Sequence, residues 1–374
     1  MNPKGPRLDA SFLRTPGGWP YLLAPLIPVA VVLELLGAPA TVVFAVSALG
    51  IIPTAALMGR ATEELAARSG PGIGGLLNVT FGNAPELIIA LFALGQGLQE
   101  VVKASIVGSI IGNMLLVLGA AMLAGGIGRQ KQRFSRTSAS IQTTMLMLAS
   151  AALIMPAIFE LVEGKGLPAP GAEAIDYGGT VEHLSLAVAV VLMATYVIGL
   201  FFSLKTHRDL FNPEYEDEDS WGWSTRTSVI ALAIAGVLVG IMSEVLVGSI
   251  TEASESIGLS QFFIGVIVVA IVGNAAEHWV AVLVAMKDKM DLAVNIAVGS
   301  SAQVALFVAP ILVLASYLIG PYPLALVFNG FELGAILLAI LVGNHVTADG
   351  ESTWFEGVQL LAVYFVFGLA FYFA

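Results

Sequence analysis

The stretch LLNVTFGNAPELIIALFALGQGL (residues 76–98) is apolar enough to cross a membrane, but it carries Asn83, Pro85 and Glu86 at its centre. A carboxylate near the middle of a bilayer costs at least about 2.5–3.5 kcal/mol, and a proline removes a backbone donor from a helix. The stretch GNAAEH (residues 273–278) repeats the pattern GNAPEL (residues 82–87) later in the chain. Two such unfavourable insertions indicate a function that needs polar groups at membrane depth.

The composition of the chain is that of a polytopic, all-α membrane protein. Of its 374 residues 57% are hydrophobic and only 11% are charged, whereas soluble domains carry about 25% charged residues. The absence of cysteine excludes disulfides and thiolate metal sites. With a net charge of −11 and no basic patch, the sequence gives no sign of a nucleic-acid partner. We therefore expect a multi-pass chain whose surroundings are a lipid bilayer.

Long apolar runs recur along the chain, and we expect about eleven transmembrane helices. Their expected bounds are 19–37, 39–59, 72–98, 104–127, 139–160, 182–204, 227–249, 261–286, 292–318, 322–343 and 355–374. The first is expected to be an uncleaved span rather than a signal peptide. With the N-terminus inside, fourteen Lys and Arg residues fall in inside segments and only Lys103 and Lys165 fall outside. This positive-inside bias supports both the orientation and the number of spans.

An internal repeat relates the two halves of the chain. An offset of 191 residues maps GNAPE onto GNAAE and Gly108-Ser109 onto Gly299-Ser300. Between residues 64–119 and 255–310, 14 of 56 positions are identical, and the informative identities are Gly, Asn, Ser and Glu. The two copies lie an odd number of spans apart, so they are inverted relative to each other. Inverted repeats with interrupted helices are typical of secondary transporters, whose substrate site lies near the midplane.

The repeat predicts four parts of the chain. They are an N-terminal segment with an extra helix (1–37), a first five-helix repeat (38–204), an acidic cytoplasmic linker (205–226) and a second five-helix repeat (227–374). At about 1.5 Å per helical residue, Glu86 lies near the middle of its span. The linker contains NPEYEDEDS (212–220), which is either a solvated connection or a cation-attracting or regulatory element.

The two copied motifs predict a cation site. Asn83 and Glu86 are three residues apart and share one helical face, and Asn274 and Glu277 do the same in the inverted copy. A two-fold axis in the membrane plane would bring the two pairs face to face. Two carboxylates, two amides and carbonyls freed at a helix break at Pro85 form an oxygen cage that suits Ca²⁺. Zinc and copper prefer thiolates or several histidines.

A second pair of motifs, VGSIIGN (107–113) and VGSSAQ (298–303), adds polar groups to the same spans. We expect Asn113 and Gln303 to act as ligands or to support the ligands, because amides are costly to bury without a partner. Ser109 and Ser300 are further oxygen donors. The alternative is that these small residues serve only helix packing.

His278 distinguishes the two copies, because Leu87 occupies the matching position in the first. An imidazole at membrane depth suits a proton carrier, although a neutral histidine bonded to a neighbour fits equally. Three further acids fall within predicted spans, namely Glu34, Glu244 and Glu332. Glu332 is expected well inside its helix. Each of the three has either a structural role or a role in proton transfer or cation entry.

The sequence resembles the cation/proton exchanger (CAX) family, within the superfamily that includes sodium/calcium exchangers. The resemblance rests on GGLLNVTFGNAPELIIAL (74–91), GSIIGNMLLVLG (108–119), IGVIVVAIVGNAAEH (264–278), VGSSAQVALFVAP (298–310) and DGESTWFEG (349–357). It implies that Glu86 and Glu277 bind the cation with help from Asn83, Asn274, Asn113, Gln303 and the two Gly-Ser turns. It also implies alternating access, with Ca²⁺ extrusion driven by inward proton movement.

The predicted function is therefore exchange of Ca²⁺, or of another divalent cation, for protons that compete for Glu86 and Glu277. Ca²⁺ is the transported substrate, and no cofactor or catalytic residue is expected. Sodium as the counter-ion, a channel and a membrane-embedded hydrolase are the alternatives. One central site between inverted repeats argues against a channel, and the lack of a nucleophile or metal triad near His278 argues against a hydrolase. We expect a prokaryotic inner membrane; the sequence leaves the oligomeric state open.

Overall fold

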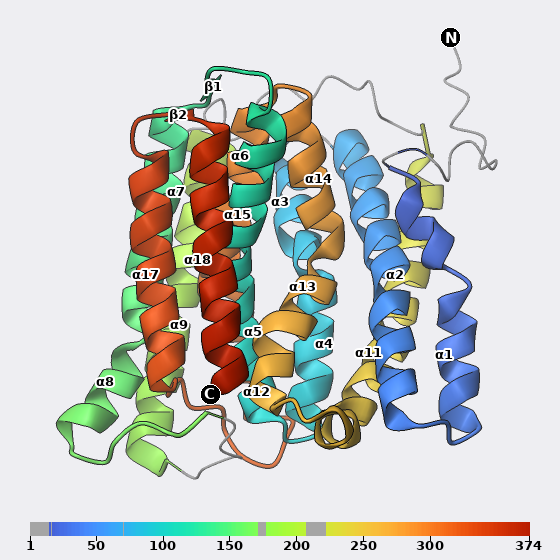
Figure 1. The fold of residues 1–374 in the computed structure, drawn as a ribbon, viewed down its shortest axis with the longest axis vertical. Coiled ribbons are helices and arrows are strands. Elements are labelled where there is room, and N and C mark those ends of the chain that lie inside the picture. The colour runs from blue at the N-terminus through green and yellow to red at the C-terminus, as the bar shows by residue number, and fades with distance from the viewer. Residues whose placement is uncertain (1–14, 16, 70, 171–176, 207–221) are drawn as a thin grey trace. The chain divides into compact units, whose positions relative to one another are not determined.

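The protein is mainly helical in the part of the chain that the structure describes (Figure 1). The computed structural model describes residues 15, 17–69, 71–170, 177–206 and 222–374. Within these residues, eight helices are long and apolar enough to span a membrane, two further helix pairs are bent at a short break, and a shorter apolar helix covers Trp19–Leu35. This confirms the predicted class of all-α polytopic membrane protein. The acidic stretch 212–220 lies outside the described residues.

The described elements follow the predicted spans closely. Before the linker they are η2 (Trp19–Leu23), α1 (Leu26–Leu35), α2 (Ala40–Ser69), α3 (Pro71–Gly82), α4 (Ala84–Gly95), α5 (Gln99–Ile111), η3 (Gly112–Val117), α6 (Leu118–Gly126), β1 (Gln132–Arg133), α7 (Arg136–Leu153), α8 (Met155–Val162), α9 (Gly179–Phe201) and η4 (Phe202–Thr206). After it they are α11 (Thr225–Ile257), α12 (Gln261–Phe263), η6 (Ile264–Val269), α13 (Ala270–Gly273), α14 (Ala275–Met286), α15 (Met290–Gln303), η7 (Val304–Val308), α16 (Ala309–Ser316), α17 (Gly330–Thr347), β2 (Glu351–Ser352) and α18 (Trp354–Phe373).

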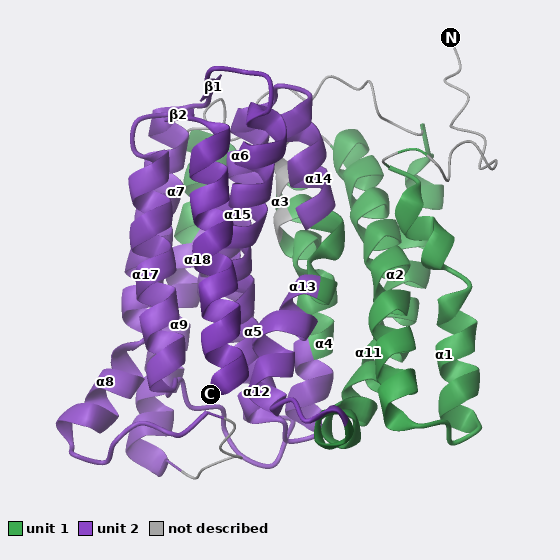
Figure 2. Ribbon diagram, in the orientation of Figure 1, with its two compact units in different colours: residues 1–89, 198–256, 272–277 green, residues 90–197, 257–271, 278–374 purple. Residues whose placement is uncertain are grey.

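The chain divides into two compact units, which Figure 2 shows in green and purple. Unit 1 comprises residues 1–89, 198–256 and 272–277. Its core joins α2, α4 and α11 through the buried side chains of Met58, Ala84, Ala235 and Val239. Ala84 belongs to the GNAPE motif, so hydrophobic packing against α2 and α11 fixes the start of α4 in this unit.

Unit 2 comprises residues 90–197, 257–271 and 278–374. Here α5 packs closely on η6 and α13, and glycines allow the approach. A Cβ on Gly108 would overlap the Val266 carbonyl and lie 2.7 Å from Ala270 Cβ, and a Cβ on Gly265 would lie 2.8 Å from Ala104 Cβ. A methyl group at either glycine would force these helices apart. Gly108 thus serves helix packing, the role considered above for the small residues of its motif.

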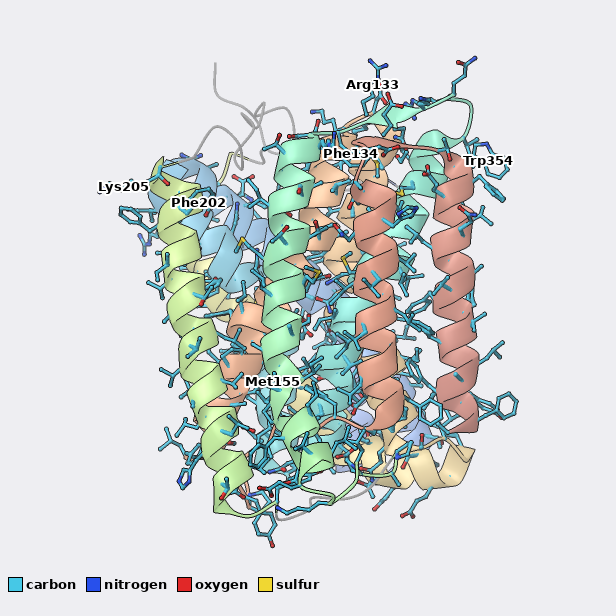
Figure 3. The ribbon with its side chains drawn as sticks, turned by 90° about the vertical axis from the view of Figure 1, so that its left-hand side faces the viewer. Arg133, Phe134, Met155, Phe202, Lys205 and Trp354 are labelled. Atoms are coloured by element: carbon cyan, nitrogen blue, oxygen red, sulfur yellow. The ribbon has the colours of Figure 1, made fainter. Side chains whose placement is uncertain are left out.

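A short antiparallel pair of strands ties two loops together at one end of unit 2. Gln132 of β1 pairs with Ser352 of β2, and Arg133 pairs with Glu351. Glu351 forms ion pairs with Lys131 and, at 3.3 Å, with Arg133. The hydrogen bond and the charge of Lys131 lower the pKa of Glu351 below its ordinary value. Figure 3 shows Arg133 at this end, which therefore carries basic residues predicted to lie inside.

At the opposite end of unit 2, the structure differs from one predicted span. Helix α17 begins at Gly330, not at residue 322, and residues 324–328 form a non-helical segment that is 0–1% exposed. We call residues 324–328 the buried segment. Its apolar sequence is typical of a membrane span, but two of its backbone N–H groups are bonded to side chains and not within a helix. Leu324 N donates to Ser316 Oγ at 2.7 Å, and Leu326 N donates to Ser185 Oγ at 3.0 Å.

The later start of α17 also moves Glu332. Asn329 Oδ1 accepts a hydrogen bond from Glu332 N at 2.9 Å, and Glu332 Oε2 accepts one from Asn329 N at 2.7 Å. This reciprocal capping box places Glu332 in the first turn of α17. The expectation that Glu332 lies well inside its helix was wrong.

Candidate cation site

Both copied motifs interrupt a helix at their asparagine. Asn83 separates α3 from α4 and Asn274 separates α13 from α14. The bend is 42° at the first break, measured from Leu76, and 59° at the second, measured from Gln261. The predicted interruption is therefore present in both repeats, but the break lies at Asn83 and not at Pro85. Pro85 occupies the first turn of α4, where a proline is well tolerated because the missing N–H needs no partner within the helix.

The two acids occupy matching positions beside these breaks. Glu86 and Glu277 each lie in the first turn of the helix that follows the break. The exposed N–H groups and the dipole at a helix N-terminus favour a carboxylate there. Leu87 N donates to Asn83 O at 3.0 Å, which starts the hydrogen bonding of α4. Asn83, Glu86 and Asn274 are 1–3% exposed, and Glu277 is half-buried.

The structure brings the two motifs together within unit 1. A Cβ on Gly82 would lie 3.0 Å from Glu277 Oε1, and a Cβ on Gly273 would lie 3.6 Å from both Cα and Cβ of Glu86. Each glycine thus faces the acid of the other copy, as a two-fold relation between the copies requires. The absence of a side chain at each glycine leaves space for the acid of the other copy, Glu277 beside Gly82 and Glu86 beside Gly273.

A cation held by Glu86 and Glu277 would need neutral oxygens as further ligands. Among the described residues there is no group of three or more His, Asp or Glu side chains that could hold a metal ion. Ca²⁺ takes six to eight oxygen ligands. A cation between Glu86 and Glu277 therefore needs amide, hydroxyl, carbonyl or water oxygens in addition, and Asn83 and Asn274 are the nearest amides in sequence.

The remaining predicted site residues lie in unit 2. Ser109 is 1% exposed on α5, and Ser300 is 5% exposed on α15. Asn113 lies in the π-helical turn η3, and Gln303 is the last residue of α15, directly before the π-helical turn η7. Asn113 is 1% exposed, and its Nδ2 has no hydrogen-bond partner among the described residues.

The π-helical turns are a feature that sequence analysis missed. η3 begins at Gly112 and η7 at Val304, so the two turns start at nearly matching positions of the two repeats. Such turns shift the backbone out of the regular i to i+4 pattern and are frequent at functional sites. No residue pattern in the two segments gives a signal for them.

A direct contact marks the two-fold relation inside unit 2 as well. Ser301 Oγ donates to Ile110 O at 3.4 Å, and these residues are 191 positions apart. A residue that contacts its own copy lies at the symmetry axis. Ser109 and Ser300 are the neighbours of this pair, so the two Gly-Ser motifs flank the axis where α5 meets α15.

His278 and the other acids of the predicted spans have different surroundings. His278 is half-buried on α14, and its Nε2 has no hydrogen-bond partner among the described residues. Glu34 and Glu244 are exposed on the surface of the helices. Glu332 is fully buried in unit 2. Of these three acids, only Glu332 is buried.

A helical membrane protein in which each of two inverted copies has an acid at a helix break, facing a glycine of the other copy, has the organisation of a secondary transporter. The sequence matches the family described as sodium/calcium exchanger protein over residues 39–205 and again over residues 227–373. The chain belongs to this family, and it is a transporter and not an enzyme.

Curated relatives cover most of the chain. It is 44% identical to a Ca²⁺/H⁺ antiporter of Synechocystis over 90% of this chain and 92% of the relative. It is 46% identical to a Ca²⁺/H⁺ antiporter of Aphanothece halophytica over 88% of this chain and 90% of the relative. It is 42% identical to the Ca²⁺/H⁺ antiporter ChaA of Bacillus subtilis over 94% of this chain and 97% of the relative.

Solved structures share the fold. Native YfkE superposes with a TM-score of 0.80 at 38% identity, covering 95% of this chain and all of YfkE. The H⁺/Ca²⁺ exchanger CAX gives a TM-score of 0.70 at 14% identity, covering 96% of this chain and 93% of CAX. At that identity the second match supports the fold alone, and it confirms the predicted exchanger-type arrangement of helices.

Proposed function

We propose that this protein exchanges Ca²⁺ for protons across the membrane. The relatives at 42–46% identity are Ca²⁺/H⁺ antiporters and match this chain over nearly its whole length. The observation that carries the proposal is the reciprocal approach of the two copied motifs, in which Gly82 faces Glu277 and Gly273 faces Glu86. The multi-pass chain belongs in a prokaryotic inner membrane, in keeping with its bacterial relatives.

In this proposal Glu86 and Glu277 bind the cation and the protons in turn. Two carboxylates that are close together and shielded from water repel each other unless they are neutralised. One Ca²⁺ or two protons neutralise the pair, and the two kinds of ligand therefore compete. If the helices change conformation only when the pair is neutral, uptake of one ligand on each side is coupled to release of the other. Each unit of pH difference then supplies about 1.36 kcal/mol per proton.

The other predicted residues take supporting roles. We assign Asn83 and Asn274 as amide ligands beside the two acids, and Asn113, Gln303, Ser109 and Ser300 as ligands or as groups that orient ligands. Asn113 is the best supported of the unit 2 residues because its buried amide nitrogen has no partner among the described residues. His278, directly after Glu277, is assigned to proton transfer.

Two five-helix repeats, 38–204 and 227–374, form the functional frame in this proposal. The two separate family matches, 39–205 and 227–373, support this division. Residues 1–37 add one helix in front, and residues 205–226 connect the repeats. Each repeat contributes one acid and one asparagine to the site, so alternating access is expected to involve both.

The test is transport by the purified full-length protein in proteoliposomes that contain a Ca²⁺ indicator. We expect a pH gradient to drive Ca²⁺ flux without sodium, and Glu86→Gln or Glu277→Gln to abolish it. Glu252→Gln removes an exposed acid from α11 and is the matched control, which keeps the flux. Normal transport by both site variants would refute the site, and flux driven only by a sodium gradient would refute proton exchange.

A further inference from the structure

A second group of ionisable side chains is buried in unit 2, at the end where the buried segment lies. Lys103 on α5 forms an ion pair with Glu100 and donates to Val327 O at 3.1 Å. Two residues beyond Val327, Asn329 caps α17 and holds Glu332 in its first turn. We call Glu100, Lys103, Asn329 and Glu332 the Glu332 cluster.

The members of the Glu332 cluster are shielded from solvent more completely than charged side chains normally are. Glu332 and Asn329 are 0% exposed, Lys103 is 2% exposed and Glu100 is 6% exposed. Three of their polar atoms, Glu100 Oε2, Asn329 Nδ2 and Glu332 Oε1, are buried without a hydrogen-bond partner among the described residues. Such atoms are unfavourable in a protein interior unless a further ligand satisfies them.

The charges of the cluster do not balance. Glu100 and Glu332 are two carboxyl groups, and Lys103 is the only cation acting electrostatically on Glu332 within the described chain. Lys103 contacts Glu100 directly, whereas Glu332 has no ion pair among the described residues. With every group ionised, the cluster would hold one uncompensated negative charge, which is costly to bury.

Among the described residues, neighbouring elements supply no unpaired second cation. Lys165 is already paired with Glu160 of α8 at 3.3 Å and with Glu163 at 3.1 Å. Tyr177, directly before α9, lies beside Lys103, whose Nζ is 5.7 Å from the ring centroid. Glu182 in the first turn of α9 adds a further acid. Burial and the negative charge of Glu100 therefore favour a neutral Glu332. The charge of Lys103, the hydrogen bond from Asn329 N and the place of Glu332 in the first turn of α17 favour the carboxylate.

We propose that Glu332 is a proton-binding site separate from the paired Glu86 and Glu277 motifs, and that it carries its proton at neutral pH. One proton makes the cluster electrically neutral. It also turns Glu332 Oε1 from an acceptor into a donor. A metal ion is the wrong ligand here, because the ammonium group of Lys103 repels it and the described residues contain no cluster of three metal-binding side chains.

Proton binding at Glu332 has a consequence for the fold around it. The buried segment is held at Val327 by Lys103 and is followed directly by the Asn329 cap. Loss of the proton would leave a buried negative charge beside this segment. The site therefore couples proton occupancy to the packing between α5, the buried segment and α17.

The experiment is infrared spectroscopy of the purified full-length protein at neutral pH with saturating Ca²⁺. The signal measured is the carbonyl stretch of protonated carboxyl groups, identified by its shift in heavy water. We expect Glu332→Gln to remove one such signal, and Glu160→Gln, which replaces a buried acid paired with Lys165, to leave the spectrum unchanged. An unchanged spectrum for Glu332→Gln would overturn the proposal.

A second variant tests the charge balance. Lys103→Met removes the cation that compensates Glu100, so we expect Glu100 to take up a proton and the protonated carboxyl signal to double relative to the Glu332 signal. No increase in a folded Lys103→Met protein would contradict the assignment of charges. Because the Glu332 signal does not depend on Ca²⁺ transport, it persists even if the proposed exchange function fails.

Discussion

Substitution of one glycine tests the geometry of the proposed cation site without removing any of its proposed ligands. In Gly82→Ala the new methyl group would stand 3.0 Å from Glu277 Oε1, whereas ordinary contact begins at 3.4 Å. The carboxylate must therefore retreat by about 0.4 Å. Because Oε1 is the end of a flexible side chain, the carboxylate moves more readily than the helix does. Gly82 is the last residue of α3 and does not have a positive φ, so an alanine adds no backbone strain there.

The expected loss falls on cation binding. Oxygen ligands hold Ca²⁺ at about 2.3–2.6 Å, so a displacement of about 0.4 Å takes Glu277 out of this range. Substitution of groups that orient metal ligands typically lowers affinity by about 10–100-fold, which corresponds to about 1.4–2.8 kcal/mol. We expect Gly82→Ala to bind Ca²⁺ about 10–100-fold more weakly at fixed pH, with an unfolding temperature close to that of the unmodified protein.

The copy of this glycine provides the matched control. A methyl group on Gly273 would meet Ile89 Cδ1 at 3.5 Å and Glu86 at 3.6 Å, which are ordinary contacts. Gly273→Ala should therefore bind Ca²⁺ with an affinity close to that of the unmodified protein. Titration calorimetry of the purified protein compares the two variants. Equal affinities for both, or a loss confined to Gly273→Ala, would refute the geometry on which the site rests.

Three further predictions concern unit 2. Gly108→Leu should abolish the folded protein in detergent, measured by size-exclusion chromatography, because even a Cβ overlaps the Val266 carbonyl; a well-folded variant would contradict the packing of α5 on η6. Phe328→Ala should lower the free energy of unfolding by about 3–5 kcal/mol, since the ring is fully buried, and a loss below about 1 kcal/mol would contradict that burial. Glu351→Gln should lower the unfolding temperature slightly at neutral pH but not in acid. Because the pKa of Glu351 is lower in the folded than in the unfolded protein, its ion pair stabilises the fold at pH values above the unfolded-state pKa. This stabilisation is lost as the pH falls through the folded-state pKa. A difference in unfolding temperature between Glu351→Gln and the unmodified protein that persists in acid would therefore exclude the ion pair with Lys131.

The placement of the two motifs opposite each other was predictable from the internal repeat. Once GNAPE and GNAAE are related by an offset of 191 residues, a two-fold axis places each glycine opposite the other acid. The exact place of the break was not predictable from proline chemistry. The second copy has Ala276 where the first has Pro85, and both break at the asparagine, so proline is not the cause.

The span predicted at 322–343 shows what a single sequence leaves undecided. A short apolar run fits a buried extended segment as well as the start of a helix. The choice depends on whether distant side chains can satisfy the backbone, and Ser185, Ser316 and Lys103 do so here. The environment of Glu332 follows from the same contacts, which lie more than 140 residues apart in two of the three cases.

The contact between Ser301 and Ile110 has a further meaning for a protein built from two copies. In a symmetric dimer of identical chains, a position on the axis meets itself, so a hydroxyl must face a hydroxyl or a methyl must face a methyl. A single chain with two copies escapes this restriction and can place unlike residues there. Serine on one side can donate to the backbone at isoleucine on the other. Joining the two copies in one polypeptide thus allows the residues that meet at the two-fold axis to differ between the copies.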